Sequence, residues 1–327
     1  MLKRAARRDE TITFLRAGSY LTFGEKNWSP IFSLCTTLST FLMYEIWNSS
    51  NSLLAESETL RSNQVQLGFP SLLIPAGETH IKIVSEWIRS CDTQHPRPDT
   101  SFIPTRLLRV GDLGSRRVQL ACHLGEKLKS VEYVALSHRW GTPDQKQPEE
   151  VKFASTTFDN INKIREPESI DEAILPRTFR DAVILTRKLG KEYLWIDSLC
   201  ILQKKDKDGD PESKADWEKE SKLMEQVFSS AYFTIAASCA DHRFDGFLKP
   251  RAPRQYVTLA TDEGAQFHVC DVIDQFDVDV EQGELNKRGW VLQERALSRR
   301  TIHLTKTQTY WECGDGVRCE TFTQAKK

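Results

Sequence analysis

The stretch 288–298, which reads RGWVLQERALS, places a tryptophan and a carboxylate one helical turn apart. Residues four apart lie on the same face of a helix, so Trp290 and Glu294 can present an aromatic surface and a negative charge to one ligand. A glutamate on an amphipathic helix is just as commonly solvated or ion-paired. The arginines close enough in sequence to pair with it are Arg288, Arg295 and Arg299. The stretch therefore supports two interpretations, a ligand-binding carboxylate or a surface ion pair.

Three short apolar runs are typical of buried strands, and the first two end in polar residues. They cover residues 133–137, 193–197 and 232–237. Residues with helical periodicity fill the two intervals, at 176–189 and 216–230. This alternation of strand and helix predicts an α/β fold, with a parallel sheet flanked by helices.

Smaller patterns predict how these elements begin and what precedes them. Pro176 suits the first turn of the first helix, and Asp216 is expected to cap the second. Upstream, residues 81–88 have the period of a short amphipathic helix. Residues 107–110 and 118–120 predict two short strands around a turn.

Ligands of open α/β sheets bind beyond the carboxyl ends of the strands. That rule brings residues 137–141, 197–203 and 237–241 around a common cleft. The stretch carrying Glu294 follows the third strand after an inserted segment, 247–287, and is expected to reach the same rim.

Charge and composition exclude several classes of partner. The 327 residues include 45 Lys and Arg against 46 Asp and Glu, a net charge of −1. This balance gives no electrostatic case for nucleic acid or for an anionic membrane. No closely spaced glycine fingerprint, P-loop or serine-nucleophile elbow is present, which disfavours a redox NAD enzyme or an NTPase.

The eight cysteines are scattered and include no Cys-x-x-Cys pair, so we expect reduced thiols in a cytoplasmic protein. Cys91 and His95 have metal-like spacing. Zinc requires four ligands, and Pro98, which stands where a third is expected, cannot coordinate. We therefore expect no metal site and no bound cofactor.

The first hundred residues carry few periodic apolar segments. We expect residues 1–105 to be an N-terminal extension, partly disordered or helical and packed beside the core, and residues 106–327 to form the main domain. Residues 31–44 are uncharged but shorter than the roughly 20 apolar residues that a membrane-spanning helix needs. A buried or peripheral helix is the favoured interpretation of that run, and a membrane span is the alternative.

Several blocks, in order along the chain, resemble the fungal heterokaryon-incompatibility (HET) domain. They are YVALSHRWG at 133–141, LPRTFRDA at 175–182, YLWIDSLCILQ at 193–203, Asp216-Trp217 with Met224, and RGWVLQERALS at 288–298. Two departures stand out. Many members carry a tyrosine or cysteine where this chain has His138-Arg139, and the region of Cys91 and His95 lacks the second cysteine that some relatives show.

The HET domain is in turn similar to Toll/interleukin-receptor (TIR) domains, which have a flavodoxin-like fold. This resemblance implies a flavodoxin-like parallel sheet with the strand 133–137 between 193–197 and 232–237. Catalytic TIR domains need a glutamate, at the position that Glu294 matches, to cleave NAD. The resemblance thus implies that Glu294 is catalytic and that NAD is a substrate.

The implied substrate-binding residues follow the same motifs and are Ser137, Arg139, Trp140, Gly141, Asp197 and Trp290. Either tryptophan can stack on a base or on the cationic nicotinamide, and core packing is the alternative for both. Arg139 can hold a phosphate or pair with a nearby carboxylate.

The motifs leave two functions open. In the first, the protein acts in fungal innate immunity and programmed cell death by hydrolysing NAD at the nicotinamide-ribose bond. In the second, the same fold is a non-catalytic module that signals by self-association. The expected partners are further copies of the chain and an upstream cell-death receptor. Fold alone does not separate the two functions.

Overall fold

The computed structural model describes residues 71–126, 128–142, 146–204, 210–254 and 275–321, and the strands that lie outside these ranges. The side chain of Trp290 is not among those that the structure describes. The chain divides into two units. One comprises residues 1–73, 251–275 and 318–326, and the other comprises residues 74–250 and 276–317.

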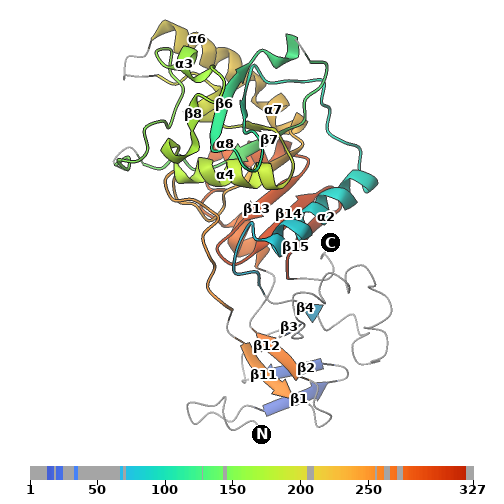
Figure 1. The fold of residues 1–327 in the computed structure, drawn as a ribbon. Coiled ribbons are helices and arrows are strands. Elements are labelled where there is room, and N and C mark those ends of the chain that lie inside the picture. Colours follow the sequence, from blue (N-terminus) through green and yellow to red (C-terminus); the bar gives the residue numbers. More distant parts are fainter. Residues whose placement is uncertain are drawn as a thin grey trace. The chain divides into compact units, whose positions relative to one another are not determined.

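The larger unit is built on a mixed sheet whose strands follow the order β15-β14-β13-β10-β7-β9-β5-β6-β8. Figure 1 labels six of these strands, β6, β7, β8, β13, β14 and β15. The bounds of the sheet strands are β5 Arg106–Arg109, β6 Arg117–Cys122, β7 Tyr133–Ser137, β8 Ile170–Asp171, β9 Tyr193–Trp195, β10 Phe233–Ala236, β13 Thr301–Leu304, β14 Thr309–Cys313 and β15 Gly316–Cys319. This is a mixed α/β fold.

Four neighbouring strands, β13, β10, β7 and β9, run parallel. The expectation that β7 lies between β9 and β10 is confirmed. All five residues of β7 are buried, because strands in the middle of a parallel sheet are covered on both faces. The predicted strand pair upstream is also confirmed, since β5 and β6 pair antiparallel.

The helices that connect the parallel strands are α4, α6, α7 and α8. Their bounds are α4 Arg177–Lys188, α6 Pro211–Glu220, α7 Met224–Ser230 and α8 Gly289–Leu297. Helix α4 packs on β9, and α7 packs against α8. Each parallel pair needs such a crossover, which a helix supplies. Pro176 immediately precedes α4 as its N-cap residue, and Gly190, with φ +70°, follows its end.

The predicted cap of the second helix is wrong. Asp210, not Asp216, caps α6, and its side chain accepts a hydrogen bond from Ser213 N. Pro211 occupies the first turn of the helix, so the cap lies six residues before the expected one. Asp216 instead contacts Arg106 Nη2 at 2.5 Å and accepts the amide of Leu202 at 2.8 Å.

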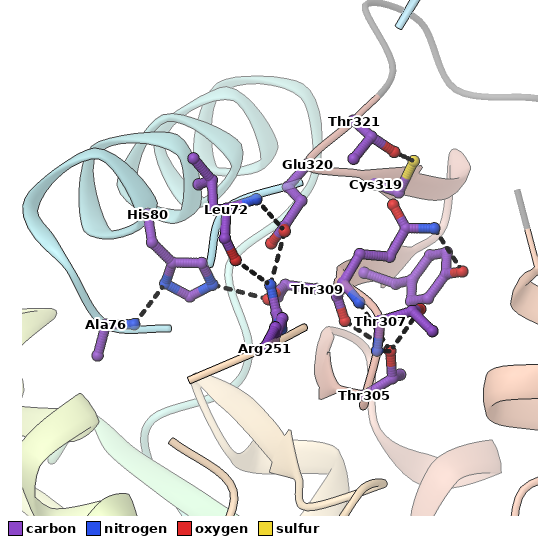
Figure 2. A network of polar contacts seen from close by, with 12 residues as sticks. Leu72, Ala76, His80, Arg251, Thr305, Thr307, Thr309, Cys319, Glu320 and Thr321 are labelled. Atoms are coloured by element: carbon purple, nitrogen blue, oxygen red, sulfur yellow. Dashed lines mark hydrogen bonds and ion pairs between the residues drawn. The ribbon is translucent and has the colours of Figure 1, made fainter. Parts of the chain in front are cut away.

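Helix α2 (Glu78–Gln94) is longer than the predicted 81–88 and runs beside β14 (Figure 1). Ala76 N donates to His80 Nδ1 at 3.1 Å, so the ring's other nitrogen carries the proton toward Thr309 Oγ1 at 2.7 Å (Figure 2). Farther along α2, Asp92 accepts hydrogen bonds from Arg300 and Tyr232, each at 2.5 Å. These contacts connect both ends of the helix to the sheet.

The smaller unit contains a four-stranded sheet in the order β11-β12-β3-β4 and a hairpin of β1 (Thr13–Ala17) and β2 (Tyr20–Gly24). The sheet strands are β3 Ser33–Cys35, β4 Leu67–Gly68, β11 Tyr256–Ala260 and β12 Gln266–Cys270. Within this unit, Arg251 Nη1 and Glu320 Oε1 form a buried ion pair at 2.6 Å (Figure 2).

Two expectations for the N-terminal region concern residues that are only partly described. Within 31–44, residues 33–35 form the strand β3, so the helix favoured for this run is wrong at these residues, and the rest of the run lies outside the described residues. No helix in the described part of the chain is long and apolar enough to cross a membrane. The boundary at residue 105 stays a prediction.

Candidate functional site

Ser137 ends β7, and Asp197 follows the carboxyl end of β9 as the first residue of the short helix α5 (Asp197–Cys200). Both side chains influence the pKa of Glu294, which lies in the second half of α8. The turn after β7 is positioned by Ala237 N, which donates to Ser137 O at 3.0 Å. The three side chains thus come from three elements that are far apart in sequence.

Glu294 is partly exposed, yet protein atoms crowd around its carboxyl group. Burial, with a smaller contribution from the negative charge of Asp197, raises the pKa of this carboxyl to about 7. The Ser137 hydroxyl and the Arg288 cation oppose that rise. Because Ser137 Oγ has no partner within hydrogen-bond geometry, its contact with Glu294 is weaker than a full hydrogen bond. The carboxyl group changes its protonation near neutral pH.

Two of the three arginines that could have paired with Glu294 bind other groups. Arg295 binds both oxygens of Glu312, at 2.8 and 2.7 Å. Arg288 Nη1 donates to the carbonyl of His138 at 2.9 Å. Among the described residues, none forms an ion pair with Glu294.

Asp197 has a different role, because its two oxygens are already engaged. Trp140 Nε1 donates to Oδ2 at 2.7 Å, and the amide of Ser198 donates to Oδ1 at 2.6 Å. His138 Nδ1 lies 3.9 Å from Oδ1. Asp197 therefore fixes the positions of the Trp140 ring and of the loop around it.

His138 is buried beneath this loop and packs edge-on against Phe179, with ring centroids 5.1 Å apart. Burial lowers the pKa of His138, and the positive charges of Arg288 and Arg243 lower it further, while Asp197 opposes the change. Its Nε2 atom has no hydrogen-bond partner. A neutral imidazole is the expected state at pH 7.

Arg243 supplies a second cation at the site. Its guanidinium carbon lies 5.4 Å from the centroid of the Trp140 ring, within the range of a cation–π contact. Burial lowers the pKa of Arg243, and the charge of Asp197 opposes that change. The Nε atom is buried without a hydrogen-bond partner. An anionic ligand group would satisfy it.

The remaining predicted residues lie in less enclosed positions. Arg139 Nη1 is 3.4 Å from Asp241 Oδ1, so it forms the ion pair that was the alternative to phosphate binding. Gly141 is exposed and adopts φ +95°, a turn conformation that glycine favours. Trp290 lies in the first turn of α8, and its side chain is outside the described residues.

Three residues of the site were not identified from the sequence, although two of them stand in the quoted motifs. His138 is in the first motif and Arg288 opens the last. Arg243 lies in the loop after β10, where no sequence pattern indicated it. Its proximity to Trp140 depends on the folded loop, so spacing along the chain could not reveal it.

A cavity of about 480 Å³ opens along another side of α8. Its lining includes Leu292, Arg295, Ala296, Arg299 and Cys313. Neither Glu294 nor Asp197 belongs to this lining. In the described residues, the group with metal-ligand geometry is Cys91, His95 and Cys313, which also excludes both carboxylates.

Residues 133–294 match the family model for heterokaryon incompatibility protein (HET). The match begins at the first residue of β7 and ends at Glu294, so it contains every residue of the site described above. It indicates involvement in heterokaryon incompatibility. Comparisons with curated proteins and with solved structures found no match.

Proposed function

We propose that this chain, whose residues 133–294 form a HET domain, hydrolyses NAD at the bond between nicotinamide and ribose. The observation that carries the proposal is the state of Glu294, a crowded carboxyl group with a pKa of about 7 and no ion-pair partner among the described residues. Perturbed carboxyl groups of this kind are typical of catalytic sites. Through this reaction the protein would contribute to programmed cell death in incompatible fungal cells.

The order of the parallel strands supports the TIR-like part of the proposal. Numbered along the chain, β9, β7, β10 and β13 stand in the order 2-1-3-4. This is the order of the flavodoxin-like sheet, in which ligands bind at the carboxyl ends beside strand 1. Ser137 ends that strand here.

The proposed reaction needs one carboxylate and one water molecule. The bond from ribose to the nicotinamide nitrogen breaks, and its electron pair leaves with the nitrogen, which becomes neutral. Positive charge then develops on the ribose, where the Glu294 carboxylate stabilises it. Water forms the new bond to the same carbon and loses a proton, which a carboxylate of pKa near 7 can accept. The products are nicotinamide, ADP-ribose and a proton.

The other side chains bind and orient the substrate in this proposal. Arg243 carries a buried Nε without a partner beside the Trp140 ring, so the pair suits a phosphate and a flat base or pyridinium ring. Asp197 is a positioning residue, because it holds Trp140 by a 2.7 Å hydrogen bond. Ser137 lies beside the carboxylate and can orient it toward a ribose hydroxyl.

The test is to incubate the purified, concentrated full chain with NAD and to measure free nicotinamide and ADP-ribose. Stoichiometric release of both, abolished in Glu294→Gln, supports the proposal. If the chain assembles but releases neither product, the enzyme assignment is wrong, and a non-catalytic self-associating module becomes the better account of the same fold.

A further inference from the structure

Two cysteines and a histidine meet at the contact between α2 and the end of β14, within the larger unit. Cys91 and His95 are one helical turn apart, Cys91 on α2 and His95 just after its end, and Cys313 ends β14. One ligand atom from each residue lies within 4.8 Å of the others. Cys91 Sγ is 3.1 Å from His95 Nδ1, and the two thiols are close enough to hydrogen bond. We propose that this cluster, outside the matched HET segment, binds a zinc ion.

The donor set fits zinc better than other common divalent metals. Thiolates and imidazole are the ligands that zinc prefers, whereas calcium and magnesium require oxygen ligands. With zinc bonds of about 2.3 Å to sulfur and about 2.1 Å to nitrogen, ligand atoms of a tetrahedron stand about 3.6–3.8 Å apart. The observed spacing needs only small side-chain rotations to reach this geometry.

His95 is held in the orientation that a ligand requires. Its Nε2 atom lies 2.9 Å from Asp315 Oδ1, so the carboxylate accepts the proton on that nitrogen and leaves the Nδ1 lone pair facing the sulfurs. Metal-binding histidines commonly have such a carboxylate on the opposite ring nitrogen. Asp315 lies two residues after Cys313, in the turn between β14 and β15.

A buried tryptophan provides a second, independent feature of the cluster. Trp311 is fully buried, and its Nε1 atom has no partner within hydrogen-bond geometry. It lies close enough to Cys313 for the indole N–H to interact with that sulfur. A thiolate is a stronger acceptor than a thiol, so binding of the metal would improve this contact.

The fourth ligand would be water. Cys91 is buried, but Cys313 is partly exposed and lines the 480 Å³ cavity along α8. A zinc ion held by the three side chains can therefore keep one position open toward solvent, as three-ligand zinc sites do. On binding, each sulfur forms a bond to the metal and its thiol proton goes to solvent. The proposal departs from the expectation, based on Cys91, His95 and Pro98, that no metal site exists, because it takes the third ligand from Cys313.

The experiment measures metal binding by the full chain, independently of any NAD cleavage. The metal-free, reduced protein is titrated with zinc and separately with cobalt, whose absorption reports a tetrahedral thiolate site. The expected result is one zinc per chain, with the cobalt–sulfur absorption band and a higher melting temperature. Cys313→Ser and His95→Ala should both lose this binding, while Cys122→Ser, a half-buried cysteine outside the cluster, should retain it.

Asp315→Asn should weaken zinc binding without abolishing it, because the variant leaves the three ligands in place. Loss of the carboxylate behind His95 should weaken zinc binding about 10–100-fold. Zinc bound equally well by Cys313→Ser would overturn the proposal, as would absence of binding in a parent protein whose fold is verified by circular dichroism. A Cys91–Cys313 disulfide that persists under reducing conditions would overturn it as well.

Discussion

Replacement of Glu294 by glutamine should stabilise the protein at alkaline pH while it abolishes catalysis. The pKa of this carboxyl rises from 4.5 to about 7 on folding, chiefly because the group is buried. Between these two values the folded state holds a proton that the unfolded chain has released, so stability falls as pH rises from 4.5 through 7. The difference amounts to about 3 kcal/mol above pH 7. Glutamine cannot ionise and avoids this loss.

The stability of both proteins should be measured by urea denaturation at pH 4.5 and pH 8. At pH 4.5 or below, parent and Glu294→Gln are expected to differ little. At pH 8 the variant should be more stable by up to about 3 kcal/mol. Glu312→Gln is the matched control, because it should change stability in the opposite direction. Hydrogen bonds from Arg295 and His303 outweigh burial and hold the pKa of Glu312 at about 2. That replacement should destabilise the protein at pH 8.

The Glu294→Gln substitution should lower activity although it raises stability at alkaline pH. Glu294→Gln is expected to lower the rate of nicotinamide release on the order of 10²-fold or more, because the amide cannot stabilise a developing positive charge. Parent activity should rise with pH through about 7 as the carboxyl ionises. Gln293→Ala, an exposed neighbour on the same helix, should retain activity.

Two outcomes would refute this reasoning at different steps. If Glu294→Gln were less stable than the parent at pH 8, the carboxylate would have a stabilising partner, and the account of its environment would be wrong. If the variant were more stable and still cleaved NAD like the parent, the environment would be as described but the catalytic role of Glu294 would be wrong.

Three further predictions concern contacts around the sheet. Arg106→Ala should lower the free energy of unfolding by about 3–5 kcal/mol, because it leaves the mostly buried Asp216 carboxylate without its cation; denaturant titration measures this, and a loss below about 1 kcal/mol would contradict it. Gly246→Ala should cost more than about 1 kcal/mol in the same assay, since the residue has φ +78° and the added carbon would lie 2.7 Å from neighbouring side-chain atoms; an unchanged midpoint would show that those atoms yield easily. Trp140→Phe removes the hydrogen bond to Asp197 and should cost about 1.5–3 kcal/mol, with weaker NAD binding by calorimetry; unchanged affinity would remove Trp140 from the binding site.

The central strands could be predicted from the sequence because burial on both faces leaves a continuous apolar run. Residues 133–137 coincide with β7, and the run at 232–237 contains β10. The start of α6 was misplaced because Asp216 has a capping residue's chemistry but makes a tertiary ion pair instead. Local patterns identify elements well, whereas a long-range contact such as that between Arg106 and Asp216 appears only after folding.

The site shows the same division between local and long-range information. Glu294 and Asp197 stand in recognisable motifs, but the pKa of Glu294 depends on which side chains surround it. Cys313 gave no signal because its neighbours in the metal-ligand cluster, Cys91 and His95, are far away in sequence. Spacing along the sequence can suggest two ligands on one helix. It cannot identify a third ligand that another element brings close in the folded protein.

Two glutamates near α8 show why burial alone does not define a catalytic carboxylate. Both Glu294 and Glu312 are removed from much of the solvent, which disfavours the charged form of each. Arg295 and His303 donate hydrogen bonds to Glu312, so its pKa falls to about 2 and the charge is permanent at neutral pH. Glu294 has the Ser137 hydroxyl beside it and no comparable donor among the described residues, so its pKa rises to about 7. A carboxylate whose charge is already neutralised by a bound cation can stabilise a positively charged ribose only weakly. An unpaired carboxylate gains its counter-charge as the positive charge moves from the nicotinamide ring to the ribose in the proposed reaction. The difference in partners, rather than in burial, is therefore the reason to propose Glu294, and not Glu312, as the catalytic carboxylate.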